Sequence, residues 1–168
     1  MFGKKSWQEG DYIFSSQPDG EYKNIIVGIV TGIENSKIGV NGIIINPIGL
    51  KNKVSQGKAG PRSTEILKNP DHTNCVFALI YRVEHENFTG VLDVNSDAVV
   101  KIHKKIYGII DGWVRESLPE LINNVLSLPD GPEKDGAKRI LKQRMDTLYD
   151  KDLKKYLYSI CRSLKILN

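Results

Sequence analysis

The sequence predicts an α+β fold, with a small, strongly curled antiparallel sheet in the first half of the chain and a layer of helices in the second. Before Asp93 the apolar residues form short runs that are rich in β-branched side chains and bounded by Gly, Asn and Pro, which is typical of buried strands. After Asp93 they recur at helical spacing. Strands followed by helices favour a sheet with one face covered by the helices.

The strands are expected where β-branched runs stand between turn signals. The first leaves through Gln17-Pro18-Asp19-Gly20, a strong turn signal, and the third must stop at Pro47, which cannot donate to a strand ladder. Gly28 and Gly32 lie within the second strand and precede no helix, so we interpret them as close backbone approaches or bends. The expected strands are 12–15, 22–33, 40–46, 64–67, 74–83 and 89–94.

The helices are expected after residue 94. Asn95 or Ser96 caps the first, whose apolar stripe runs from Val99 to Trp113, a core residue. The next begins at Ser117, with a proline in its first turn. The last two are expected over 132–149 and around Leu153, Leu157, Ile160 and Leu164. No linker or repeat interrupts the chain, so we expect a single domain over 1–168, with a β-rich part (1–94) and a four-helix part (95–168).

Composition and cysteine usage narrow the class of protein. Forty per cent of the 168 residues are hydrophobic and 26% are charged, which suits one soluble globular domain. No apolar run approaches the roughly 18 residues of a membrane helix, and none follows the basic start, so we expect a cytoplasmic protein without membrane contact. Cys75 and Cys161 belong to no metal-ligand spacing, so we expect buried, reduced thiols, no metal and no cofactor.

Positive charge is concentrated in two segments. Residues 51–68 and 151–168 each carry five basic side chains against one acidic side chain, a net charge of +4 in each. Such a concentration attracts polyanions, because neutralised phosphates release counterions. Residues 48–63 hold three glycines, a proline and no apolar period, which predicts a long polar loop. We expect this loop to bind nucleic acid through Lys51, Lys53, Lys58 and Arg62. For 151–168 a solvated helix face is favoured.

The common nucleotide-binding, zinc-protease and hydrolase motifs are absent from the sequence, whereas acid–base chemistry by histidines stays open. No phosphate-binding loop, dinucleotide fingerprint, zinc-protease motif or hydrolase elbow occurs. His72 and His85 are the types of side chain that shuttle protons to and from an RNA 2′-hydroxyl, with a cation on the phosphate. The alternative is that the two histidines are unrelated, since one follows a turn and the other follows a strand.

Other conspicuous side chains have ordinary interpretations. Arg82 and Glu84 are expected to form an ion pair at a strand end. Trp7, next to Lys4 and Lys5, is interpreted as a hydrophobic plug under the expected barrel, with stacking on a nucleic-acid base as the alternative.

The order of motifs over about residues 8–112 resembles the MazF/PemK toxin family and its ToxN-like relatives. The matching features are Gly10-Asp11-Tyr12-Ile13 as an opening strand, the strand Lys23 to Val30, and Ile43 to Gly49 with its Pro47-Ile48. The strand Cys75–Glu84, followed by Thr89 to Leu92 and a helix, is also similar. The resemblance implies a small SH3-like β-barrel with helices that cuts RNA without a metal, in a homodimer or with an antitoxin-like protein partner.

Residue by residue, the sequence departs from the family at two positions. As catalytic residues we expect Lys23, the basic residue at the start of the second strand, together with Lys51 and Arg62 of the cationic segment and His72 as a proton shuttle. The family's arginine at the start of the second strand falls at Lys23 or Asn24, and its hydroxyl residue after Pro-Ile is Gly49. A lysine holds a phosphate as a point charge without arginine's fork, and glycine supplies no hydroxyl.

Two functions are therefore expected as alternatives. The first is an RNA-directed protein, either a metal-independent endoribonuclease or a relative that has lost cleavage. The second is a non-catalytic module that binds a protein partner through the sheet or the helices.

Overall fold

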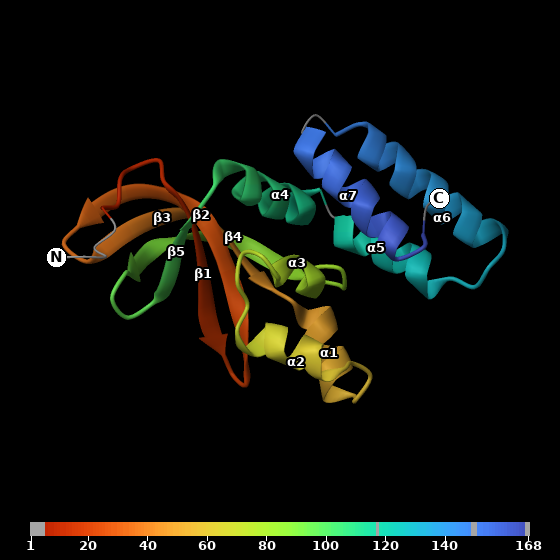
Figure 1. Cartoon of the computed structure of the whole chain (residues 1–168), viewed down its shortest axis with the longest axis horizontal. Coiled ribbons are helices and arrows are strands. Elements are labelled where there is room, and N and C mark those ends of the chain that lie inside the picture. Colours follow the sequence, from red (N-terminus) through yellow and green to blue (C-terminus); the bar gives the residue numbers. More distant parts are fainter. Residues whose placement is uncertain (1–5, 117, 149–150, 167–168) are drawn as a thin grey trace.

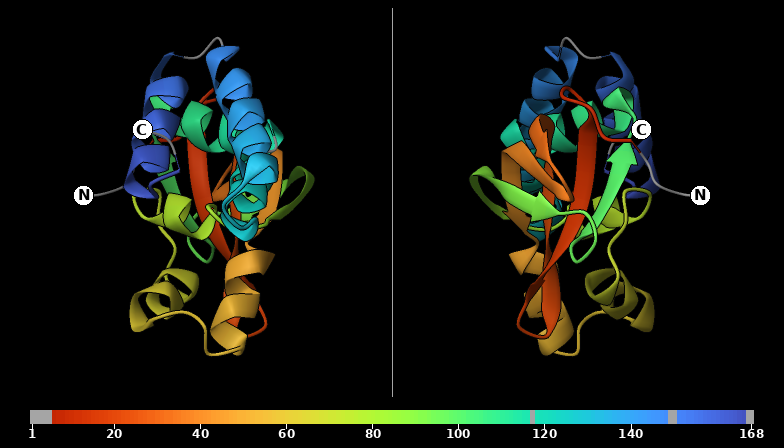
Figure 2. Two further views of the ribbon diagram at one scale, coloured as in Figure 1. Left: turned by 90° about the vertical axis from the view of Figure 1, so that its right-hand side faces the viewer. Right: turned by 90° about the vertical axis from the view of Figure 1, so that its left-hand side faces the viewer.

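The chain folds as an α+β protein with an antiparallel sheet and a C-terminal group of helices. The computed structural model describes residues 6–116, 118–148 and 151–166, apart from the side chains of 76, 77, 152 and 153. The five-stranded sheet has the order β4-β3-β2-β1-β5. In Figure 1 helices α4 to α7 lie on one side of the sheet, and α1 and α2 lie beside the closed end of the β1–β2 hairpin. Figure 2 shows the same separation of the two helical groups from both sides.

The first three strands form the predicted meander. They are β1 (Tyr12–Asp19), β2 (Tyr22–Glu34) and β3 (Lys37–Asn46). Gly20, with φ 67°, allows the tight β1–β2 turn. Gly28 lies opposite Gly42, and a Cβ on Gly42 would lie 2.0 Å from the Val27 carbonyl oxygen. Gly28 is thus the predicted close approach, whereas Gly32 lies at the register shift after Val30, where the strand bends.

The sheet curls but stays open among the described residues, because its edge strands, β4 (Glu84–Asp93) and β5 (Ala98–Ile102), do not pair with each other. Its concave face still encloses an apolar cluster, to which both edges contribute: Phe88 and Leu92 come from β4 and Val99 from β5. Trp7 packs against this cluster, as an apolar plug would. The α+β class is therefore confirmed, and the expected closure into a barrel is not observed.

The expected strand over 74–83 is wrong. Residues Cys75–Ala78 form a short helix, α3, and the chain then runs irregularly to β4. Leu79 is fully buried in the main core, and the Trp113 indole Nε1 donates to its carbonyl oxygen over 2.8 Å. A short apolar run of this kind is typical of a buried helix as much as of a buried strand, so its composition alone does not discriminate.

The expected loop over 48–63 and edge strand over 64–67 are also wrong. This segment forms α1 (Ile48–Ser55) and α2 (Pro61–Lys68). Pro61 takes the first position of α2, where its missing N–H costs nothing. Leu50, Ile66 and Leu67 are buried together with Ala78 in a small third cluster. The apolar residues of these helices are few, which explains why no period is visible in the sequence.

The boundary between strands and helices lies later than residue 94. Val99 and Ile102 were expected in the first long helix but belong to β5, which pairs with β1 from Ser16↔Ala98 to Tyr12↔Ile102. Helix α4 (Lys104–Arg115) begins only after His103, whose Nδ1 accepts from the Lys105 amide over 3.0 Å. The β-branched pair Val99-Val100 suits a pleated strand, and pairing with β1 outweighs the helical spacing.

The remaining helices follow the prediction closely. They are α5 (Leu118–Ser127), α6 (Pro132–Asp146) and α7 (Lys151–Ser163). The expected starts and ends at Ser117 and Tyr149 lie outside the described residues, as do Lys4, Lys5 and the side chain of Leu153. Trp113 of α4 is fully buried, as predicted, in a cluster that runs from the sheet into helices α4 to α7. Both cysteines are free and buried, as expected.

Candidate nucleic-acid interface

Lys51 is the predicted site residue with the best-defined surroundings. It lies on α1, and its ammonium donates to Asn24 Oδ1 over 2.8 Å and to Asp19 Oδ2 over 3.1 Å. Only 11% of the Lys51 side chain is exposed, against 53% for Asp19. An ammonium has three donors, so two of them are already engaged. Lys51 therefore fastens α1 to the end of the β1–β2 hairpin, and its charge is largely neutralised by Asp19.

Lys53 takes a different direction from the same helix. Its ammonium lies 5.0 Å from the centroid of the Tyr81 ring, a cation–π arrangement at a partly exposed aromatic side chain. Tyr81 packs against the small cluster under α1 and α2 and also against the main core, so its ring is held in place. Cation and ring together form a surface on which a base could stack beside a bound phosphate.

The same segment carries three further cations, of which Lys58 and Arg62 were predicted to bind nucleic acid and Lys68 was not. Lys58 is exposed between the two helices, Arg62 is exposed in the first turn of α2, and Lys68 is exposed at its last residue. We call Lys53, Lys58, Arg62, Lys68 and Tyr81 the α1–α2 surface. Its charge comes from the segment that the sequence singled out, but helices present that charge where a loop was expected.

Lys23 lies close to this surface in the fold but faces away from Lys51. It stands on β2 opposite Pro18, next to Asn24, which binds Lys51. Because successive side chains of a strand point to opposite faces, Lys23 and Asn24 leave the sheet on different sides. The structure thus joins Lys51 to the residue beside Lys23 and not to Lys23 itself.

Of the two alternatives for His72 and His85, the structure favours unrelated histidines. The His72 ring lies edge-on to Phe14 of β1, with 6.4 Å between ring centroids, and its Nδ1 is buried without a hydrogen-bond partner. His85 is exposed on the edge strand β4, opposite Ile45 of β3. Strands β2 and β3 separate β1 from β4, so the two imidazoles lack the common substrate position that acid–base catalysis requires.

Gly49 lies at a position where a side chain has no room. Its amide donates to the Arg82 carbonyl oxygen over 2.8 Å. A Cβ at this position would lie 2.6 Å from the Arg82 nitrogen and 2.8 Å from the Arg82 oxygen. Arg82 and Glu84 pair with each other over 3.4 Å at the surface, as expected. The start of α1 therefore packs against backbone, and no serine or threonine fits there.

Sequence reasoning missed three of the residues that shape this region. Asp19 was seen only as part of a turn, Asn24 only as part of a strand and as an alternative position for the arginine of the toxin family, and Tyr81 only as part of an apolar run. The turn proline and glycine around Asp19 placed it at a hairpin tip, but no sequence signal connected it with Lys51, 32 positions away. For Tyr81 a sequence signal existed: a tyrosine that ends an apolar run near a basic segment is a candidate for stacking on a nucleic-acid base.

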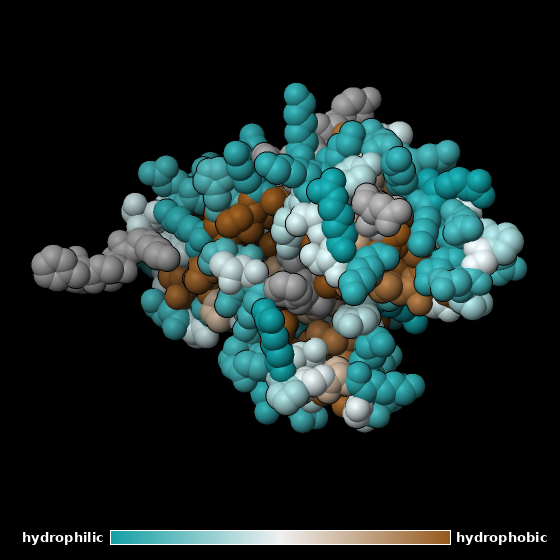
Figure 3. All heavy atoms as spheres, turned by 45° about the vertical axis from the view of Figure 1, so that its right-hand side comes forward, coloured by the Kyte–Doolittle hydropathy of each residue, from teal (hydrophilic) through white to brown (hydrophobic). Residues whose placement is uncertain are grey.

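Apolar exposure does not point to another site. The large apolar side chains with the greatest exposure come from separate elements of the described chain, and Figure 3 shows separate hydrophobic areas within a mostly hydrophilic face. They are Ile33, Val91, Val100, Leu126 and Ile140. Scattered exposure of this kind is normal for folded proteins.

Comparison of the chain with protein-family models, curated proteins and solved structures found no match. Within the described parts, no helix has the length and apolar character needed to cross a membrane. Nor do three or more His, Cys, Asp or Glu side chains of those parts gather as they would around a metal ion.

Proposed function

We propose that the protein is an RNA-directed protein of the MazF/PemK-like kind that binds single-stranded RNA on the α1–α2 surface and does not cut it. The observation that carries this proposal is the Lys53 ammonium 5.0 Å from the centre of the Tyr81 ring, among further cations of α1 and α2. Stacking on an aromatic ring combined with charge on the backbone is how proteins hold single strands without reading their sequence.

Binding without cleavage is supported by three details of the site. A metal-free nuclease needs a cation at the scissile phosphate and a group that accepts the 2′-hydroxyl proton. The candidate cation, Lys51, is tied to Asp19 and Asn24, and the family's hydroxyl position is the tightly packed Gly49. His72 faces Phe14 and has no histidine partner.

The finer predictions about fold and location belong to the same proposal. A sheet that curls around an apolar cluster, with the last strand returning to the first, is compatible with an SH3-like barrel that has opened between β4 and β5. A cytoplasmic location fits an RNA ligand. An antitoxin-like partner or a second copy of the chain would find an unpaired strand edge at β4.

That edge also supports the rival function, a protein-binding module. Among the described strands, β4 pairs with β3 alone, and Val91 on it is 62% exposed. An extended segment of another protein could add to such an edge through main-chain hydrogen bonds. The rival predicts no dependence of binding on Lys53 or Tyr81.

The test is fluorescence anisotropy with a short, labelled single-stranded RNA of mixed sequence in EDTA, with the same samples run on a denaturing gel. We expect binding that weakens steeply between about 50 and 200 mM salt, with intact RNA on the gel. The variant Lys53→Ala/Lys58→Ala/Lys68→Ala should flatten the plot of log K against log salt by about 2, at about 0.7 per lost contact. Tyr81→Leu should weaken binding about tenfold through lost stacking.

The matched control is Lys37→Ala/Lys104→Ala/Lys134→Ala, which removes three charges from β3, α4 and α6 and should leave binding close to wild type. Equal losses in the control and the α1–α2 variant would mean that only net charge matters, against the proposal. RNA that stays unbound at low salt would overturn the proposal, and discrete fragments in EDTA would overturn its statement that the RNA is not cut.

A further inference from the structure

A second cationic surface lies on α7, at the other helical group of the molecule. Five side chains of this helix line an open hollow of about 290 Å³. They are Lys151, Lys154, Lys155, Tyr158 and Arg162. Spacings of three, four and seven residues place them on one helical face, and from 151 to 162 that face extends about 16 Å along the axis. We call these residues the α7 surface.

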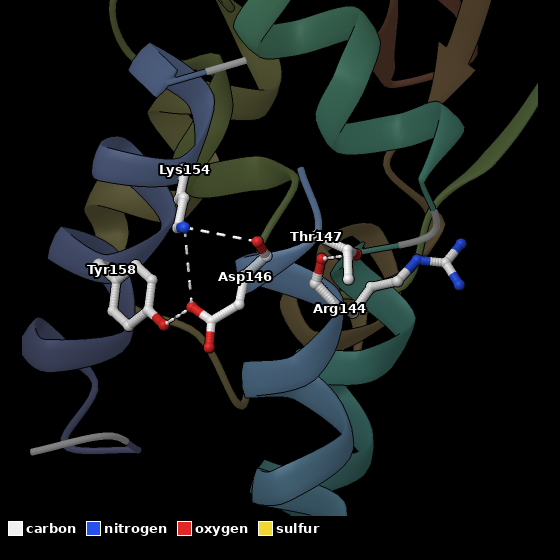
Figure 4. A network of polar contacts seen from close by, with 5 residues as sticks. All are labelled: Arg144, Asp146, Thr147, Lys154 and Tyr158. Atoms are coloured by element: carbon white, nitrogen blue, oxygen red, sulfur yellow. Dashed lines mark hydrogen bonds and ion pairs between the residues drawn. The ribbon is translucent and has the colours of Figure 1, made fainter. Parts of the chain in front are cut away.

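The centre of the α7 surface is held by Asp146, the last residue of α6. As Figure 4 shows, the Tyr158 hydroxyl donates to the Asp146 carboxylate, and the Lys154 ammonium approaches both this carboxylate, at 3.9 Å, and the Asp146 carbonyl oxygen, at 3.4 Å. The bond to Asp146 and burial raise the pKa of Tyr158 to about 12, so its hydroxyl keeps its proton at neutral pH. Asp146 therefore fixes the middle of the surface and offsets the charge of Lys154.

The cations on either side of this centre pair with no acidic side chain among the described residues. Lys151 and Lys155 are exposed near the start of α7, and Arg162 is exposed in its last turn. The Arg162 guanidinium lies 5.9 Å from the centroid of the Tyr158 ring. The surface thus presents charge at both ends and an ordered aromatic ring between them.

Its length and composition favour a nucleic-acid backbone. A stripe of about 16 Å spans more than one phosphate of a strand, so a polyanion uses it better than a single small anion does. A lipid surface fits less well, because membrane-surface helices insert an apolar face. On the opposite side of α7, Leu157 and Cys161 are fully buried in the core and are not available to a membrane.

We infer that the α7 surface is a second contact for the phosphate backbone of single-stranded RNA, separate from the α1–α2 surface. This inference rests on the proposed function, since it concerns the same ligand. In Figures 1 and 2 α7 lies away from α1 and α2, so a strand that touches both surfaces follows the outside of the molecule over several nucleotides.

The test is the binding of single-stranded RNA of increasing length by the variant Lys151→Ala/Lys155→Ala/Arg162→Ala. On a long RNA we expect about tenfold weaker binding at low salt and a slope of log K against log salt that is smaller by about 2. When the RNA is too short to extend beyond the α1–α2 surface, the variant should bind it with the same affinity as wild type. Lys151→Arg/Lys155→Arg keeps the charges and should retain long-RNA binding, while far-UV circular dichroism checks the fold of each protein.

The outcomes separate this inference from the proposed function. Wild-type protein that binds no RNA overturns both. Loss of binding in the α1–α2 variant, with an α7 variant that matches wild type on every RNA length, overturns the α7 contact alone. An equal loss in the control Lys37→Ala/Lys104→Ala/Lys134→Ala, or α7-dependent binding to phosphatidylserine vesicles with unchanged RNA binding, also overturns it.

Discussion

Asp71 shows how a single carboxylate begins a helix in this chain. Its Oδ1 accepts from the amides of Thr73, over 2.8 Å, and Asn74, over 2.9 Å, and its carbonyl oxygen accepts from the Cys75 amide. In return Asn74 Oδ1 accepts from the Asp71 amide over 2.9 Å, which is a reciprocal cap before α3. Hydrogen bonds from Thr73, first among several causes, lower the pKa of Asp71.

We predict that Asp71→Ala lowers the free energy of unfolding by about 1 kcal/mol at pH 7. Asp71→Asn keeps an acceptor but loses the charge. Because the folded-state pKa is lowered, the charge of Asp71 stabilises the protein above the unfolded-state pKa, and this contribution disappears as the pH falls through the folded-state value. In urea unfolding, the free energy of unfolding of wild type should exceed that of Asp71→Asn at neutral pH, and the two values should be equal at acidic pH. A constant difference would contradict the assigned cause.

The two thiols give a second prediction at this scale. Burial, first among the causes, raises the pKa of Cys75 to about 12, and burial raises that of Cys161 to about 11. Thiolate is the reactive form, so both side chains should resist alkylation in the folded protein. We expect iodoacetamide at mildly alkaline pH to label neither cysteine natively and both in denaturant, as read by mass spectrometry. Native labelling at the rate of an unfolded peptide would be incompatible with their burial.

At the scale of elements, the contact between β2 and β3 depends on a pair of glycines. Gly42 leaves no room for a Cβ beside the Val27 carbonyl, whereas a Cβ added to Gly32, at the bulge, would meet nothing within 4 Å. We predict that Gly42→Ala lowers the free energy of unfolding by about 2–3 kcal/mol through overpacking. Gly32→Ala is the control and should stay within about 0.5 kcal/mol. Chemical denaturation measures the free energy of unfolding of both variants. Equal losses of stability in the two variants would mean that β2 and β3 can shift to make room for the added Cβ.

The same scale shows which elements the sequence could predict. Strands β1 to β3 and helices α5 to α7 have long, regular patterns with turn residues at their ends. Residues 74–83 and 98–102 lack such a pattern. A short β-branched run is equally consistent with a strand, a buried helix or the apolar stripe of a longer helix. Residues 98–102 form a strand because they pair with β1. Residues 74–83 instead form α3 and an irregular segment that packs against Trp113, whose indole donates to the Leu79 carbonyl oxygen.

Helices α1 and α2 were missed for a related reason, and the arrangement of the α1–α2 surface was therefore missed as well. Leu50, Ile66 and Leu67 are the buried residues of these two helices, and because the rest of the segment is mostly polar, its sequence is typical of a loop. The charge of the segment was visible in the sequence. Which cation is tied to Asp19 and which lies over Tyr81 depends on contacts between distant parts of the chain, and no local pattern encodes them.

For the molecule as a whole, the main core crosses from the sheet into the C-terminal helices. One cluster contains Phe14 and Ile25 of the sheet, Trp113 of α4 and Cys161 of α7. Trp7 lies apart from it, against the cluster on the concave face, with the Lys101 ammonium 5.3 Å from its ring centroid. The two tryptophans therefore report on different parts of the chain.

We predict that these parts unfold together, because separating sheet from helices would expose the shared core to water. Trp113→Phe leaves Trp7 as the fluorescent reporter of the sheet, and Trp7→Phe leaves Trp113 as the reporter of the core at α4. In each variant the fluorescence and far-UV circular dichroism transitions in urea should coincide, although Trp113→Phe unfolds at a lower concentration because the Leu79 carbonyl loses its indole donor. A Trp7 transition that precedes the loss of helical signal would instead show that the sheet and the C-terminal helices are independent folding units.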